Sequence, residues 1–197
     1  MKYSQEVLVR IIDCLNQGGV VCFPTETVYA LSCDANNQEA INRIYQIKQR
    51  PMTKAFAVLV DSIGMAKHYV EINNFAEDFI EKHSPGPVSY VLPIKENAEL
   101  AHFFTNNKTL AFRIPDHKIA QDILRNYGKA LVGTSVNISS QASAVTFQDV
   151  PESLKLSIDV LIEEDKPTAS GISSTIFDLS SQDIRILRAG EIDLKKK

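Results

Sequence analysis

Cysteine, long apolar runs and an excess of charge are all scarce in this sequence. Its three cysteines, Cys14, Cys22 and Cys33, are odd in number and lack the spacing of metal ligands, which indicates reduced thiols in the cytosol. No run approaches the roughly 18 apolar residues of a transmembrane helix, so no segment is expected to span a membrane. The net charge of −3 argues against nucleic-acid contacts along the whole chain, but it leaves room for a local basic pocket.

Common catalytic and phosphate-binding motifs are missing as well. The sequence contains neither Gly-x-x-x-x-Gly-Lys-Ser/Thr nor Gly-x-Gly-x-x-Gly, and no serine lies in a nucleophile elbow. The four histidines (His68, His83, His102 and His117) are scattered, so each is interpreted as a surface or packing residue. No metal site is therefore predicted. The first residues lead straight into an amphipathic pattern, without the apolar core of a signal peptide.

The composition that remains is that of a globular protein with a substantial core. Hydrophobic residues make up 44% and charged residues 23%, and a length of 197 residues predicts a single domain over 1–197. Strands alternate with helices early and strand pairs come late. This order predicts an α/β domain with an open, twisted, mixed parallel and antiparallel sheet and flanking helices.

The expected elements follow from apolar periodicity and from capping residues. Strands are expected at 20–23, 55–60, 88–93, 109–114, 130–132, 158–162, 174–179 and 184–187. Helices are expected between Ser4 and Gly18, from Asn36 or Asn37 to 47, briefly from Asp61, over 74–82, from Asp116 to Tyr127, and over 146–154. Irregular segments are expected at 24–29, 94–108 and 133–140, and the lysines at 195–197 are expected to form a solvated tail.

The stretch from Phe23 to Lys54 organises the candidate site. A strand stops at Pro24, which cannot donate to a sheet ladder, and a loop rich in hydroxyl groups follows. The next helix ends near Pro51 and delivers Lys48, Arg50 and Lys54 together. A solvated helix end favoured by the helix dipole would explain any one of these cations. A polar small molecule that carries phosphate is the alternative.

Arg113 is harder to explain as a surface residue. It interrupts an apolar strand, and an arginine on an interior strand needs an anionic partner. Arg188 follows a similar apolar strand and raises the same question. Ligands of open α/β sheets bind beyond the strand ends, where this sequence places polar loops at 24–29, 113–116, 133–140 and 188–190.

Seven short segments occur in one order along the chain: Phe23 to Tyr29, Lys48 to Pro51, Pro85 to Val88, Arg113 to His117, Thr134 to Asn137, Ser174 to Ile176 and Leu187 to Gly190. Each segment is weak alone, whereas the ordered set is specific and covers roughly residues 18–190. Taken in this order, the segments resemble the YrdC-type family, the threonylcarbamoyl-AMP synthases, in its short, single-domain, TsaC-like form.

The resemblance implies a YrdC-like fold with a large, positively lined cavity. It implies a cytoplasmic nucleotidyltransferase that uses L-threonine, bicarbonate and ATP, with Mg²⁺ accompanying the nucleotide. The threonine amine is first carboxylated, and the carbamate oxygen then attacks the α-phosphate, which releases pyrophosphate. The product passes to a tRNA threonylcarbamoyl-transfer complex, which modifies the adenosine beside the anticodon. Weak direct RNA binding is a further expectation.

The resemblance also assigns roles to individual residues. Lys48 and Arg50 are expected to hold the phosphates and to be the catalytic residues. Further contacts to ATP are expected from Lys54, Thr109, Asn137, Thr146 and Arg188. The threonine-binding residues are expected to be Thr27, Arg113, Ser135 and Ser174. For Arg113, the threonine carboxylate competes as partner with a protein carboxylate such as Asp116 or Glu26.

Three departures from the family pattern replace glycine. Ala30 and Ser32 stand in the usual Tyr-Gly-Leu-Gly, and Ser140 stands in the usual Ser-Gly, so we expect a slightly reshaped pocket rather than lost activity.

Two other functions compete with synthesis. One is an RNA-binding module, which the acidic balance disfavours. The other is carbamoyl transfer, as in hydrogenase maturation, whose proteins carry zinc-finger and acylphosphatase segments that this sequence lacks.

Overall fold

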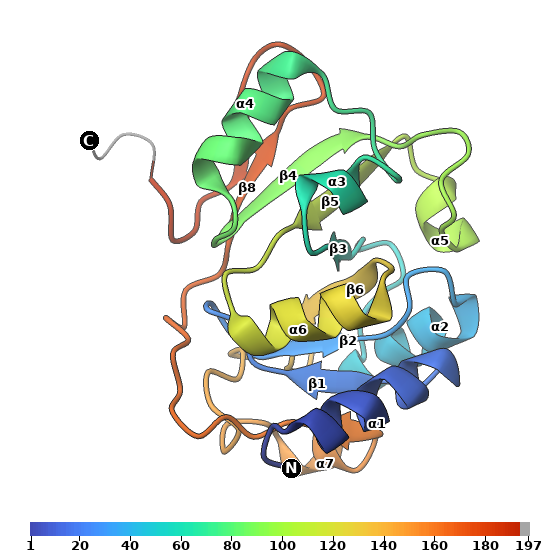
Figure 1. The fold of residues 1–197 in the computed structure, drawn as a ribbon, viewed down its shortest axis with the longest axis vertical. Coiled ribbons are helices and arrows are strands. Elements are labelled where there is room, and N and C mark those ends of the chain that lie inside the picture. Colours follow the sequence, from blue (N-terminus) through green and yellow to red (C-terminus); the bar gives the residue numbers. More distant parts are fainter. Residues whose placement is uncertain (194–197) are drawn as a thin grey trace.

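A single nine-stranded sheet runs through the computed structural model, which describes residues 1–193 (Figure 1). Its order is β7-β1-β2-β6-β3-β5-β4-β8-β9. The strands are β1 (Val21–Phe23), β2 (Ala30–Ser32), β3 (Ala57–Leu59), β4 (Val88–Pro93), β5 (Thr109–Arg113), β6 (Leu131–Ser135), β7 (Val160–Leu161), β8 (Thr175–Asp178) and β9 (Arg185–Arg188). Pairs β1–β7, β3–β5 and β4–β8 are parallel and the other neighbours are antiparallel, which confirms the predicted mixed sheet.

Helices flank this sheet, and buried apolar side chains of the helices and strands form two cores. The helices are α1 (Gln5–Asn16), α2 (Gln38–Lys48), α3 (Ile63–Ala66), α4 (Asn74–His83), α5 (His102–Thr105), α6 (Lys118–Tyr127) and α7 (Glu152–Lys155). Helices α1 and α6 lie side by side (Figure 1), and Ile11 and Ile123 pack with Phe23 in the smaller core. The larger core contains Ile44 of α2 and Phe112 of β5.

Strand alternation decides where a cavity can open. Val58, Tyr90 and Phe112, on neighbouring strands β3, β4 and β5, all face the larger core. Because successive side chains of a strand point to opposite faces, Leu59 and Arg113 are directed to the other face. A cavity opens on that second face of the sheet.

Local signals in the sequence place most helix ends correctly. The Asn37 side chain accepts a hydrogen bond from the Ala40 N–H at 3.0 Å and caps α2, as predicted. Ser4 caps α1 in the same way, by accepting from Val7. Gly128 ends α6 with φ of +74°, a conformation that glycine adopts without steric cost.

Some boundaries differ from the predictions because tertiary contacts decide them. Strand β6 continues to Ser135, through residues predicted to be a loop, because they pair with β2. Strand β2, only three residues long, was not predicted. The helix expected over 146–154 was wrong for its first half: the Asp149 carboxylate accepts bonds from the Val145 and Thr146 N–H groups and holds a turn there.

Two helix starts also differ. Residue His117, not Asp116, occupies the N-cap of α6, and its side chain makes no capping bond. A four-residue helix, α5, interrupts the segment expected to be irregular over 94–108. Among residues 1–193 the longest helix has 12 residues, and none is long and apolar enough to cross a membrane. The tail at 195–197 lies outside the described residues.

Candidate active site

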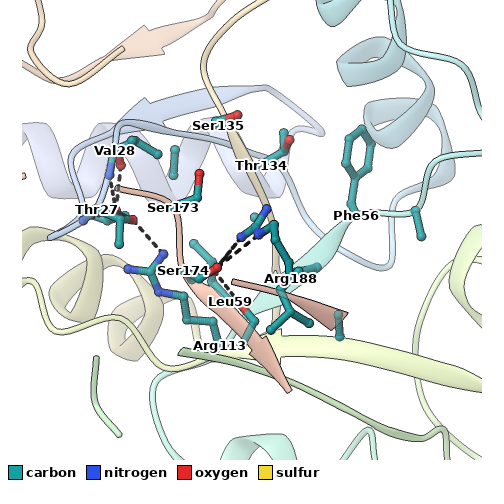
Figure 2. Close-up of a pocket in the computed structure, with 18 of the residues that line it drawn as sticks. Thr27, Val28, Phe56, Leu59, Arg113, Thr134, Ser135, Ser173, Ser174 and Arg188 are labelled. Atoms are coloured by element: carbon teal, nitrogen blue, oxygen red, sulfur yellow. Dashed lines mark hydrogen bonds between the residues drawn. The ribbon is translucent and has the colours of Figure 1, made fainter. Parts of the chain in front are cut away.

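A cavity of about 380 Å³ opens on the face of the sheet toward which Leu59 and Arg113 are directed (Figure 2). Its walls come from β2, β3, β4, β5, β6, β8, β9 and the connecting loops. The polar lining residues are Thr25, Thr27, Arg50, Ser89, Arg113, Thr134, Ser135, Ser173, Ser174 and Arg188. Most of the predicted site residues therefore meet in one place, although they are far apart in the sequence.

Arg113 is the most firmly held cation of this cavity. It is 7% exposed, and its Nε donates to the Gly86 carbonyl at 3.2 Å. Its Nη1 donates to Thr27 Oγ1 at 2.8 Å (Figure 2), and its Nη2 lies 2.6 Å from Glu26 Oε1 in an ion pair. The prediction that this strand arginine needs an anionic partner is confirmed, and within the protein that partner is Glu26.

Arg188 reaches the same cavity from the edge strand β9. The residue as a whole is exposed, but its guanidinium is part-buried and donates to the Ser174 carbonyl from Nε at 3.1 Å and from Nη2 at 2.7 Å. Nη2 also donates to Ser174 Oγ at 3.0 Å (Figure 2). Burial, and then the nearby Arg113 guanidinium, lower the pKa of Arg188. Two guanidiniums that repel each other across a cavity favour an anion between them.

Arg50 approaches from the end of α2. Its Nε and Nη2 donate to the carbonyls of Lys54 and Ala55 at 3.2 and 3.0 Å. Its Cζ lies 5.2 Å from the ring centroid of Phe56, which itself stacks on Tyr45 at 4.3 Å. These contacts fix the guanidinium at the cavity wall, and they use uncharged oxygens only.

Lys48 is not a solvated helix end, because it is 1% exposed. Its Nζ donates to the Ser135 carbonyl, to the Asn137 carbonyl at 3.1 Å and to Asn137 Oδ1 at 2.8 Å. Burial, and then the charge of Arg50, lower its pKa to about 8. The solvated-end hypothesis is therefore wrong for Lys48, whose ammonium ties α2 to the loop that follows β6.

The remaining predicted residues lie away from the cavity lining. Lys54 is exposed, and Thr109 is exposed at the opposite end of β5 from Arg113. Thr146 donates to the Asp149 carboxylate at 2.9 Å. Asn137 is buried behind the lining with Lys48. The assignment of these residues to ATP stays a prediction.

Several lining residues were not singled out from the sequence. Ser89 pairs with Arg113 across β4 and β5, and its hydroxyl lies 2.9 Å from that of Ser174. Alternation along β4 was the available signal, since Val88 and Tyr90 face the core and Ser89 must then face the other side. Phe56 carried no comparable signal.

The glycine replacements have different consequences. Ala30 and Ser32 pair regularly with β1, so no left-handed backbone is needed there, although Ala30 lines the cavity. Ser140 has φ of +72°, in the region that favours glycine. The expected reshaping is therefore backbone strain at Ser140 and one added methyl group at the cavity wall.

A pocket lined by arginines and hydroxyl groups is typical of an enzyme that binds small anions. Within residues 1–193, no group of three histidine, cysteine or acidic side chains is arranged to hold a metal ion.

The comparisons with known proteins agree with this class. A family model named Sua5/YciO/YrdC, described as "Telomere recombination", matches residues 13–190. A Vibrio cholerae protein named threonylcarbamoyl-AMP synthase is 32% identical over 188 residues, which cover 94% of this chain and 98% of the relative. The chain belongs to the Sua5/YciO/YrdC family, and the resemblance seen in its sequence is confirmed.

Solved structures show the same fold. P. abyssi Sua5 complexed with L-threonine matches with a TM-score of 0.89 and 28% identity. The match covers 97% of this chain but only 56% of that longer protein. E. coli YciO matches with a TM-score of 0.87 at 22% identity, over 98% of this chain and 93% of that one. The predicted open α/β fold with flanking helices is confirmed.

Proposed function

We propose that this protein synthesises L-threonylcarbamoyl-AMP from L-threonine, bicarbonate and ATP, with release of pyrophosphate. The observation that carries the proposal is the division of charge in the cavity. Arg113 is paired with Glu26, whereas the bonds that Arg50 and Arg188 donate go to uncharged oxygens. We call the part of the cavity around Arg113, which suits an amino acid, the amino-acid end, and the part around Arg50 and Arg188, which suits phosphates, the phosphate end. Ser174, which accepts hydrogen bonds from Arg188, lies where the two parts meet.

The amino-acid end is built around Arg113. A guanidinium can bind a carboxylate through two parallel hydrogen bonds, and Arg113 is held in place for this by its backbone and side-chain partners. The hydroxyls of Thr27, Ser135 and Ser174 are within the same lining and suit a ligand hydroxyl and amine. The L-threonine complex of P. abyssi Sua5, a member of the same fold, supports threonine as the ligand.

The phosphate end supplies charge rather than a nucleophile. In the proposed reaction the threonine amine attacks the carbon of bicarbonate, a C–O bond of bicarbonate breaks, and water leaves with a proton from the amine. One oxygen of the resulting carbamate then attacks the α-phosphorus of ATP. The bond from that phosphorus to the pyrophosphate oxygen breaks, and pyrophosphate leaves with the bonding electrons. Phosphoryl and nucleotidyl transfers of this kind need positioning and charge neutralisation. Arg50 and Arg188 provide both, and Lys48 shapes the loop beside them.

Mg²⁺ enters this proposal as part of the nucleotide substrate. The residues that line the cavity include no carboxylate, so they offer the metal hydroxyl and carbonyl oxygens only. Triphosphate oxygens and water would supply its ligands.

In this proposal the enzyme is a cytoplasmic nucleotidyltransferase, and its product passes to a complex that modifies tRNA. The balance of charge favours this over an RNA-binding module, because the net charge of the chain is −3 and the arginines named above line one cavity.

The test is pyrophosphate release measured with all three substrates and with each one omitted. We expect release only when threonine, bicarbonate and ATP are all present, together with a product of the mass of threonylcarbamoyl-AMP. Release that continues without threonine would reject the proposed reaction. RNA binding that weakens with salt, without any nucleotide turnover, would favour the alternative module.

A further inference from the structure

The three arginines of the cavity are not equivalent in charge. Within residues 1–193, Arg113 is the one of the three that forms an ion pair with a carboxylate, that of Glu26, at 2.6 Å. The side chains of this pair are 9% and 16% exposed, so solvent screens their interaction weakly. Arg50 and Arg188 donate to carbonyl and hydroxyl oxygens, which leave their positive charge uncompensated.

Glu26 reaches Arg113 from outside the cavity. It is absent from the cavity lining and instead lines a neighbouring groove, together with His117 and Glu164. Its main chain is fixed there, because its carbonyl accepts a hydrogen bond from the Ser170 N–H at 2.8 Å. Glu26 therefore cannot be a ligand for a substrate in the cavity while it holds Arg113 from behind.

The consequence concerns which anion Arg113 accepts. The Arg113 guanidinium and the Glu26 carboxylate together carry no net charge, but the guanidinium still offers N–H donors in a fixed plane. An amino-acid zwitterion also has no net charge and needs those donors for its carboxylate. A phosphate or pyrophosphate group carries several negative charges, so the Glu26 carboxylate repels it.

We infer that Glu26 is a positioning and specificity-determining residue, which neutralises Arg113 and so reserves this subsite for the amino acid. Phosphate groups are thereby directed to Arg50 and Arg188. This inference rests on the proposed function, whose two substrates differ in charge. In this inference, selection at the Arg113 subsite depends on repulsion of phosphate groups by Glu26 as much as on attraction of the amino acid by Arg113.

The test is calorimetric titration of inorganic pyrophosphate and of L-threonine into the wild type, Glu26→Gln, Glu26→Asp and a control, Glu163→Gln. Glu163 lines the same groove as Glu26, but Arg113 pairs with Glu26, so the control removes an equal charge without touching the pair. For Glu26→Gln we expect pyrophosphate to bind about tenfold more tightly, which corresponds to about 1.4 kcal/mol. We also expect threonine to bind more weakly, and pyrophosphate to compete with it.

The other variants separate charge from position. Glu26→Asp keeps the charge but shortens the side chain, so pyrophosphate affinity should stay at the wild-type value while threonine affinity falls. Glu163→Gln should change neither. Parallel loss of both affinities in Glu26→Gln would assign Glu26 a structural role only, and unchanged affinities would show that the ion pair is irrelevant to selection. Either result overturns the inference.

Failure of the proposed function gives a different result. A wild type that binds no threonine, and releases no pyrophosphate in its presence, would reject the synthase assignment. The pyrophosphate titrations of the wild type and Glu26→Gln would still decide whether Glu26 sets the charge of the subsite, because they need no turnover.

Discussion

Lys48 and Arg50 are neighbours in one motif, but the structure predicts that their removal has different effects. Lys48→Met deletes a buried ammonium that donates to three oxygens of Ser135 and Asn137. Arg50→Met deletes a guanidinium at the cavity wall, whose bonds to protein carbonyls are exposed. We therefore expect a large loss of stability from the first change and mainly a loss of turnover from the second.

The magnitude for Lys48 follows from two opposing terms. Burial, as the largest cause, lowers the pKa of Lys48 from 10.5 to about 8. At roughly 1.4 kcal/mol for each pKa unit, keeping the buried ammonium charged costs about 3 kcal/mol of folding stability, and the uncharged methionine does not carry this cost. Against it, three oxygens lose a charged donor worth about 1.5–3 kcal/mol each. The three contacts sum to about 4.5–9 kcal/mol, so the expected net loss is about 1.5–6 kcal/mol in the free energy of unfolding. That is a large fraction of the roughly 5–15 kcal/mol that stabilises a typical domain.

For Arg50 the same reasoning gives a smaller number. Its stacking on Phe56 is worth about 0.5–1 kcal/mol, so Arg50→Met should cost about 1 kcal/mol or less of stability. Turnover should fall by about two orders of magnitude, the usual effect of removing one charge-stabilising donor. Lys48→Met should lower turnover as well, because Lys48 holds the end of β6 at Ser135 and the loop that follows it at Asn137.

Urea unfolding followed by far-UV circular dichroism measures the stabilities, since the chain has no tryptophan to report by fluorescence. Pyrophosphate release measures turnover. A Lys48→Met variant as stable as the wild type would refute the reasoning, and so would an Arg50→Met variant that loses more stability than Lys48→Met.

Three further predictions follow from single contacts. Arg113→Lys should fold and bind ATP nearly normally but bind threonine about 1.5–3 kcal/mol more weakly, because lysine cannot form the planar fork; unchanged threonine affinity in calorimetry would defeat that assignment. Between pH 8 and 10.5 the unfolded chain holds the Lys48 proton more tightly than the folded protein does, so the free energy of unfolding of the wild type should rise with pH. Lys48→Met lacks this proton, so urea titrations should show the difference in stability between the two proteins changing over this range. A difference that stays constant with pH would contradict the prediction. Ser140→Gly should remove the backbone strain of the positive φ and raise the free energy of unfolding by about 0.5–1 kcal/mol. Ala30→Gly, within strand β2, should lower the free energy of unfolding by a similar amount. Melting temperatures that shift equally and in the same direction in the two variants would contradict both predictions.

Local chemistry in the sequence was enough to predict much of the fold. Asn37 capping α2, Pro24 ending β1 and Gly128 ending α6 each act through neighbouring residues, so their effects are visible without tertiary structure. The strand of Arg113 was predictable for the same reason, because its apolar pattern is continuous. The turn at Thr146 was missed, since one Asp149 carboxylate outweighs a weak helical pattern there.

The site was less accessible from the sequence, because its contacts join residues that are far apart. The burial of Lys48 depends on carbonyls 87 and 89 residues further along the chain. Likewise, residues 133–135 became a strand only through pairing with the short β2, whose three residues carry too little pattern to be recognised. Motif order predicted a set of site residues, but not which of them face the cavity.

The arrangement of the sheet explains why these residues form one site. Arg113 ends β5, Arg188 ends β9 and Arg50 follows α2, so each guanidinium arrives from a different element. Three like charges would repel one another in a shared cavity, and two features of the protein oppose that repulsion. Glu26 neutralises Arg113 from behind, and the Ser174 carbonyl and hydroxyl hold Arg188. The Arg113 guanidinium still lowers the pKa of Arg188, so some repulsion between these cations remains, and the free energy of binding phosphate beside Arg188 includes relief of that repulsion.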